Sequence, residues 1–148
     1  MKQELLNEIA EILNENSCNY SVSLGIFTSQ HKKTLTNEDI ICKTLNRNIT
    51  FYTINTVEKP EILHTVTSSL MYAGDEGSGP SQENINSHQF KSLLRDLTTS
   101  LNKIISSSTG IYSFHIKDGH PYYPVFWDFG FLFVRNNFSL VFIGSSSD

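Results

Sequence analysis

Two segments of the chain carry apolar residues at helical spacing. In the first, leucines and isoleucines recur every three or four residues, and glutamates mostly take the opposite side. Its apolar positions are Leu5, Leu6, Ile9, Ile12 and Leu13. In the second, Ser87 can cap a helix whose apolar residues keep this spacing from Phe90 to Ile105. The pattern predicts two long amphipathic helices, over residues 2–15 and 87–105.

A third and shorter helix is predicted by a capping signal. Thr36 stands three residues before Asp39, which is close to the arrangement of a capping box. Apolar residues follow at Ile40, Ile41 and Leu45. We therefore expect a short helix over residues 37–46.

Alternating and β-branched runs predict the strands. Residues 20–28 alternate apolar with small or polar side chains, and residues 49–57 are rich in β-branched and aromatic types. Three further runs, at about 111–117, 124–134 and 138–144, are separated by turn residues and predict a C-terminal β-meander. The run ending at Val134 is apolar on both faces, so we expect it at the centre of the sheet with a helix over one face.

Residues 61–73 carry mixed signals. Pro60 can open a helix, whereas Thr65, Val66 and Thr67 are β-branched. We interpret the spacing of Ile62, Val66, Leu70 and Tyr72 as a strand returning from the turn before Pro60.

The order of these elements predicts an α+β fold. We expect a mostly antiparallel sheet of about five to six strands, ending in the meander and packed by two longer helices and one short helix. The 148 residues provide for one ordinary domain, so residues 1–148 are expected to form a single unit.

Composition narrows the possible partners and the compartment. Eleven Lys plus Arg against fifteen Asp plus Glu give a net charge of −4, which disfavours binding to nucleic acid or to an anionic membrane. The start of the chain lacks a basic segment followed by an unbroken apolar run, and no apolar run approaches the length of a membrane span. We therefore expect a cytoplasmic protein.

Residues 74–81, Gly-Asp-Glu-Gly-Ser-Gly-Pro-Ser, form a loop by composition. Asp75 and Glu76 would repel phosphate, and the segment has no lysine, so it is not a nucleotide-binding loop. We expect this to be the most mobile segment of the chain, with both carboxylates available to a cationic surface.

A second candidate binding loop connects the first two strands of the meander. It contains Asp118, His120, Tyr122 and Tyr123, and two prolines brace its rings. Tyrosine-rich rigid loops suit protein recognition because a tyrosine brings a large contact area at a small loss of rotamer entropy. The alternative is a loop that folds back over the sheet to cover Trp127.

The histidines give weaker evidence for a functional site than the two loops do. His115, Asp118 and His120 lie within six residues and could converge on a zinc ion. Alternation along the strand instead places His115 on the solvent side with Ser113, so we expect no metal site and no cofactor. His31 lies in a polar loop with Lys32 and Lys33 and is interpreted as a surface residue.

Asp128 interrupts the most apolar strand of the chain, between Trp127 and Phe129. A carboxylate in a well-covered strand needs partners, so we expect it to be a structural acceptor of hydrogen bonds from backbone N–H groups, a tyrosine or Arg135. The functional alternative is a small enzyme or ligand-binding domain that uses Asp128 with His115 or His120.

Nucleophilic catalysis has no support in the sequence. No Gly-x-Ser-x-Gly turn is present, and Cys18 and Cys42 are interpreted as small buried apolar residues. The chain is therefore expected not to be an enzyme.

The overall character of the chain resembles a known group of proteins. It is short and acidic, has an aromatic meander around Trp127-Asp128-Phe129-Gly130 and an acidic loop, and carries no catalytic motif. In these respects it is similar to the small immunity proteins of bacterial polymorphic and contact-dependent inhibition toxin systems. The resemblance implies tight binding to a cognate toxin, often a cationic nuclease, which is neutralised by occlusion. The binding residues we expect are Asp75, Glu76, Asp118, His120, Tyr122 and Tyr123.

Overall fold

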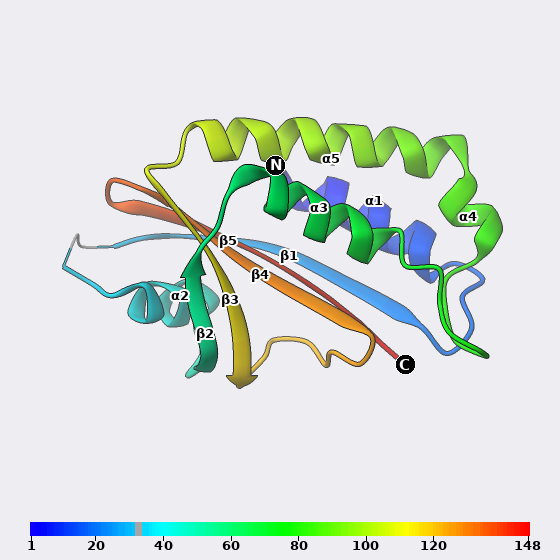
Figure 1. Cartoon of the computed structure of the whole chain (residues 1–148), viewed down its shortest axis with the longest axis horizontal. Coiled ribbons are helices and arrows are strands. Elements are labelled where there is room, and N and C mark those ends of the chain that lie inside the picture. Colours follow the sequence, from blue (N-terminus) through cyan, green and yellow to red (C-terminus); the bar gives the residue numbers. More distant parts are fainter. Residues whose placement is uncertain (32–33) are drawn as a thin grey trace.

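A computed structural model describes residues 1–31 and 34–148 and has five helices and five strands in these ranges (Figure 1). The predicted loop residues Lys32 and Lys33 lie outside the described part. The elements in chain order are α1 (Gln3–Asn14), β1 (Ser21–Gln30), α2 (Asn37–Leu45), β2 (Thr50–Thr56), α3 (Lys59–Leu70), α4 (Gln82–Asn86), α5 (His88–Ser106), β3 (Gly110–Asp118), β4 (Trp127–Arg135) and β5 (Phe138–Ser147). The predicted α+β class is confirmed.

The strands form one antiparallel sheet in the order β1-β5-β4-β3-β2. The predicted meander is confirmed as β3-β4-β5, and β4 is the central strand, as its apolar pattern predicts. β5 extends three residues beyond the predicted end and pairs with β1 from Phe138 to Ser147. This long pairing buries Ser145 and Ser146 at the end of the strand.

Helices cover both faces of the sheet, but unequally. Helices α1, α3, α4 and α5 lie on one face, which we call the first face, and α2 lies on the second face (Figure 1). On the first face, Phe129, Phe131 and Phe133 of β4 belong to the same apolar cluster as the buried residues of α1, α3 and α5. On the second face, Leu132 of β4 joins a smaller cluster with α2. Successive side chains of β4 point to opposite faces of the sheet, so this strand contributes residues to both apolar clusters.

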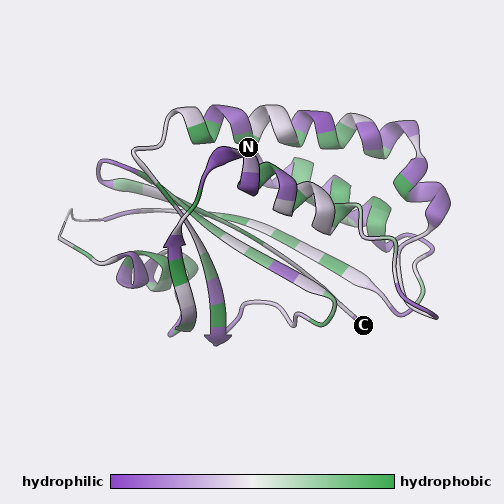
Figure 2. Ribbon diagram, viewed as in Figure 1, coloured by the Kyte–Doolittle hydropathy of each residue, from purple (hydrophilic) through white to green (hydrophobic). Residues whose placement is uncertain are grey.

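Two of the three predicted helices, α2 and α5, begin at the capping residues that the sequence indicates. The Thr36 side chain accepts a hydrogen bond from the Asp39 backbone, and the Asp39 side chain accepts one from the Thr36 backbone, which completes the capping box. Ser87 caps α5 by accepting from the Phe90 backbone. Figure 2 shows the hydrophobic residues of α5 on the side facing the other helices and the sheet. Within the described residues, no helix combines the length and apolarity that crossing a membrane requires.

The strand predicted over residues 61–73 is wrong, because this segment is helix α3. Pro60 lies in the first turn, where its missing N–H costs nothing. Ile62, Val66 and Leu70 are spaced by four residues, which places them on one side of a helix, and all three are buried. Burial of this side against the sheet outweighs the strand preference of the neighbouring threonines.

The sheet divides between β3 and β4. The two strands pair only from Gly110 to Ser113 on β3, opposite Val134 to Phe131 on β4. Beyond Ser113, β3 continues with β2 while the first half of β4 pairs with β5 alone. The Phe114 ring fills the space over Gly130, where any side chain would collide with it. This division opens the sheet at the position of Asp128.

Candidate functional site

The segment from Gly74 to Ser81, which we call the acidic loop, is a tight turn rather than a structureless connection. Asp75 and Ser78 exchange two backbone hydrogen bonds, and Gly79 exchanges two with Cys18 of the α1–β1 connection. Gly77 at the tip has a φ of +80°, which only glycine adopts easily. Backbone pairing therefore holds both ends of the turn, and the mobility expected for this segment stays a prediction. The side chains of Asp75 and Glu76 are exposed.

An aromatic cluster connects the acidic loop to the sheet. Tyr72, just before the loop, lies 6.0 Å from Tyr20 and 5.9 Å from Phe126 between ring centroids. The indole N–H of Trp127 donates a 3.0 Å hydrogen bond to the Tyr20 hydroxyl. The Tyr72 hydroxyl donates to the Asp75 carboxylate, and this bond raises the pKa of Tyr72 to about 12 because it favours the neutral phenol.

Residues 118–126, which we call the tyrosine loop, cross the second face of the sheet from β3 to the start of β4 (Figure 1). Tyr122 packs with the second-face cluster and reaches Gly25 of β1, where a Cβ would collide with its hydroxyl. The backbone N–H groups of Val125 and Phe126 donate to the Ser146 carbonyl. The loop thus covers the sheet, as one alternative expected, although it covers the second face and Trp127 packs on the first.

His120 fixes the bend of the tyrosine loop. Its Nδ1 lies 3.0 Å from the Tyr122 backbone nitrogen and 2.8 Å from the Tyr122 carbonyl oxygen. Burial lowers the pKa of His120, and this effect outweighs the opposing influences of the Tyr122 backbone and the Asp128 carboxylate. The same kind of burial raises the pKa of Tyr122.

The six predicted binding residues are only partly brought together. The two loops meet where Phe126 contacts Tyr72, so Asp75 and Glu76 lie near the β4 end of the tyrosine loop. On that loop, Tyr123 is 76% exposed and Val125 is 48% exposed. Asp118 lies at the opposite end of the loop, paired with Thr50 of β2. Tyr122 and His120 face the protein more than solvent. The contact residues Tyr72 and Phe126 were missed, because no local pattern links positions 54 residues apart.

Asp128 lies in the opening between β3 and β4 and is partly buried. The expectation of a hydrogen-bonded structural carboxylate is wrong, since no described residue donates to it. The physical reason is the division of the sheet, which leaves Asp128 uncovered by β3. This opening contains a cavity of about 210 Å³, which is lined by Asp128, by His115 of β3 and by Glu61 of α3. His115 is exposed, as predicted, and its Nδ1 lies 3.2 Å from the Thr53 hydroxyl.

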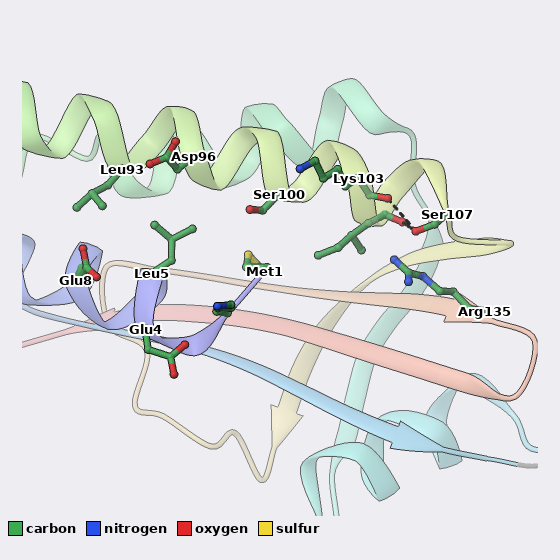
Figure 3. A pocket seen from close by; sticks show the side chains of 12 residues that line it. Met1, Glu4, Leu5, Glu8, Leu93, Asp96, Ser100, Lys103, Ser107 and Arg135 are labelled. Atoms are coloured by element: carbon green, nitrogen blue, oxygen red, sulfur yellow. Dashed lines mark hydrogen bonds between the residues drawn. The ribbon is translucent and has the colours of Figure 1, made fainter.

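The larger groove of about 740 Å³ lies between α1 and α5, above the turn from β4 to β5 (Figure 3). Leu5 and Leu93 form its apolar part. Asp96 and Glu8 lie toward one end, and Lys103 and Arg135 toward the other (Figure 3). None of these charged groups pairs with another residue that the structure describes. The groove could hold an elongated polar molecule, and Ser100 of α5 and Ser107, which follows α5, also line it.

Two further sequence interpretations are corrected by the structure. His31 is 7% exposed, and its Nε2 lies 2.6 Å from the hydroxyl of Ser139, which is buried on β5. It is therefore a core residue and not a surface residue. Cys18 is exposed, because its backbone pairs with Gly79 at the molecule's edge, whereas Cys42 is partly buried. Within the described ranges, no group of three or more His, Cys, Asp or Glu residues is arranged to hold a metal ion.

The fold and these surfaces define an open α+β domain with one antiparallel sheet and helices on both faces. No protein-family model and no curated protein sequence matches the chain. Two crystal structures of citrus MAF1 are similar in fold, with TM-scores of 0.56 and 0.60 and 16% sequence identity in each. The match covers 97% of this chain in both, and 98% and 97% of the respective MAF1 chains. The likeness shows a shared fold over nearly the whole length.

Proposed function

We propose that this protein binds a basic protein partner through its acidic loop and the exposed part of its tyrosine loop, and that it has no catalytic activity. The observation that carries the proposal is the 5.9 Å contact between Tyr72 and Phe126. It brings the acidic loop, which carries the exposed Asp75 and Glu76, against the β4 end of the tyrosine loop, which carries the exposed Tyr123 and Val125. Aromatic anchors beside charged groups of one sign are typical of protein-binding sites.

The partner we propose is a cognate bacterial toxin with a cationic surface, such as a nuclease. The protein would then act as an immunity protein in the cytoplasm and neutralise the toxin by occlusion. The net charge of −4 supports an electrostatically guided encounter with such a partner. The resemblance in size, acidity and aromatic content to immunity proteins supports the same assignment.

Binding kinetics at low and high salt test the proposal, with a toxin domain encoded next to this gene as the partner. Replacing Asp75→Lys and Glu76→Lys should slow association and weaken its salt dependence, because opposite charge accelerates encounter. Tyr123→Ala should mainly raise the dissociation rate. The matched control, Glu4→Lys with Glu8→Lys, makes the same charge change on α1 and should alter the kinetics much less. Association and dissociation rates that stay unchanged in the loop variants would overturn the proposal, and so would the absence of any protein partner.

The cavity between β3 and β4 favours a second candidate, a small-ligand or catalytic site using Asp128 with His115. Its volume of about 210 Å³ is below the roughly 300–1,000 Å³ of most ligand pockets, so we place it second. A thermal-shift screen of small polar molecules tests it. A ligand that stabilises the wild type but not Asp128→Asn would support this site, and a screen with no such ligand would reject it.

A further inference from the structure

The helices of the first face leave a long groove between α1 and α5, which we call the helix groove. Its volume of about 740 Å³ lies within the roughly 300–1,000 Å³ of most ligand pockets. None of its lining residues belongs to the acidic loop or to the tyrosine loop. The helix groove is therefore a separate candidate site, and an inference about it does not depend on the proposed toxin partner.

The charged side chains of the helix groove are separated by sign along its length. Glu8 of α1 and Asp96 of α5 lie toward one end, and Lys103 of α5 and Arg135 at the end of β4 lie toward the other (Figure 3). No residue in the described part of the chain forms an ion pair with any of these four groups. A ligand that satisfies both ends needs a positive group at one end and a negative group at the other.

Between the charged ends, the helix groove offers apolar surface and one hydroxyl. Leu5 of α1 and Leu93 of α5 form the apolar part, and Ser100 lies between the two ends (Figure 3). The Ser100 hydroxyl makes no hydrogen bond to any described residue, so it can donate to a carbonyl group of a ligand or accept from an N–H group. Lys2 and Glu4, at the start of α1, also line the groove, and their opposite charges add no net charge.

The distance between the charged ends fits a short extended peptide. Asp96 and Lys103 are separated by about 10 Å along the helix axis, because each residue of an α-helix adds about 1.5 Å. An extended chain rises about 3.3 Å per residue, so about three residues span this distance. A tripeptide with free ends carries an ammonium group at one end, a carboxylate at the other and a side chain between them.

We propose that the helix groove binds a free peptide of about three residues in an extended conformation. The ammonium group of the peptide pairs with Glu8 and Asp96, and its carboxylate pairs with Lys103 and Arg135. A guanidinium group is suited to this role because it can bind a carboxylate through two parallel hydrogen bonds. The central side chain of the peptide packs on the apolar part of the groove.

Titration of the isotope-labelled protein with the tripeptide Ala-Leu-Ala, followed by NMR, tests the proposal. Backbone amides of α1 and α5 along the groove should shift and saturate at peptide concentrations up to about 10 mM, a range that suits weak binding in an open groove. Acetylation of the peptide amine and amidation of its carboxylate should each weaken binding about tenfold, because each removes a hydrogen bond between charged groups.

Two variants assign the ends of the peptide. Asp96→Asn should weaken binding of the free peptide and should have much less effect on the acetylated one, which lacks the ammonium group. Arg135→Gln should weaken binding of the free peptide and should have much less effect on the amidated one. Glu11→Gln on α1 and Arg95→Gln on α5 remove the same charges outside the groove and should leave all affinities unchanged. Far-UV circular dichroism verifies that the variants fold.

The absence of saturable shifts over this concentration range would overturn the proposal, and so would shifts confined to residues outside the groove. Equal binding of the free, acetylated and amidated peptides would overturn it as well, because the proposal requires both charged ends. A linear aminoalkanoate of the same length carries both end charges but no peptide groups. If it bound as tightly as the tripeptide, the assignment of the groove to a peptide would be wrong.

Discussion

At the scale of single residues, the informative positions are polar side chains whose environment differs from what their neighbours in sequence suggest. His31 is buried against Ser139, although polar residues flank it. Asp128 is only partly buried and lines a cavity, although aromatic residues flank it. His120 is half-buried and holds the Tyr122 backbone. Each outcome depends on which distant strand lies beside the residue.

The stability of the protein should fall as the pH drops below about 6.5, in part because of His120. Burial lowers the pKa of His120 in the folded state, so the unfolded chain takes up a proton at a higher pH than the folded chain does. Stability is therefore fully present above the unfolded pKa and is lost as the pH falls toward the folded value. Urea unfolding between pH 5 and 8 should show a weaker pH dependence for His120→Gln than for the wild type. An identical dependence would contradict this assignment.

Tyr72 should lose its proton at a higher pH than an ordinary tyrosine. Its hydrogen bond to Asp75 raises the pKa to about 12, and removing the carboxylate charge should return it toward 10.0. The folded state holds this proton more tightly than the unfolded state, so the bond's contribution to stability is lost as the pH rises above 10. Ultraviolet difference titration of the wild type and Asp75→Asn measures the shift. A tyrosine titration curve that the substitution leaves unchanged would show that this bond does not form.

At the scale of elements, amphipathic sides and caps decide which segments become helices. The side of α5 that includes Phe90, Leu97 and Leu101 is almost fully buried in the first-face cluster. α5 packs against α1, α3 and α4, so this side helps to hold the helical layer together as well as the core over β4.

Leu97→Ala should lower the free energy of unfolding by about 2–5 kcal/mol, since truncation of a buried leucine removes apolar contact and leaves a cavity. Leu97 is 2% exposed. Leu94→Ala, at a partly buried position of the same helix, is the matched control and should cost clearly less. Chemical denaturation measures both, and equal losses would show that the buried side of α5 has been assigned wrongly.

The side-chain amides of Gln3 and Asn14 hydrogen-bond to backbone groups of Val22, Leu24 and Ile26 on the β1 edge, and these bonds should limit association. Gln3→Ala with Asn14→Ala removes all four hydrogen bonds to the edge and leaves the β1 backbone groups available to another chain. We expect the double variant to self-associate at concentrations where the wild type does not, measured by light scattering after size exclusion. Ser17→Ala, a polar substitution in the connection after α1, is the control. A double variant that does not self-associate would show that these bonds do not limit pairing.

At the scale of the whole molecule, β4 couples two cores. Phe131 and Phe133 belong to the first-face cluster, and Leu132 belongs to the second-face cluster. Disruption of either core therefore removes support from the same central strand, and a domain of this size is expected to unfold in one cooperative transition.

Ile41→Ala tests this coupling, because Ile41 is fully buried on α2 in the second-face cluster, whereas the single tryptophan, Trp127, packs on the first face. The substitution should cost about 2–5 kcal/mol. It should shift the transition followed by Trp127 fluorescence as far as the one followed by far-UV circular dichroism. Two separate midpoints would show that the cores unfold independently.

The sequence by itself determined the elements whose signals are local. The 3.6-residue period of α1 and α5, the capping residues Thr36 and Ser87, and the doubly apolar β4 are all readable along the chain, because helix and strand formation depends on neighbours within a few residues. These signals were sufficient for the α+β class and for the meander.

Only the tertiary structure decided the features that join distant parts of the chain. Segment 61–73 became a helix because burial of one side against the sheet outweighed its β-branched residues. The contact of Tyr72 with Phe126, the exposure of Asp128 where β3 leaves β4, and the capping of β1 by Gln3 and Asn14 depend on strand order and helix placement. Long-range burial and the satisfaction of backbone hydrogen bonds set these features, and neither has a local pattern in the sequence.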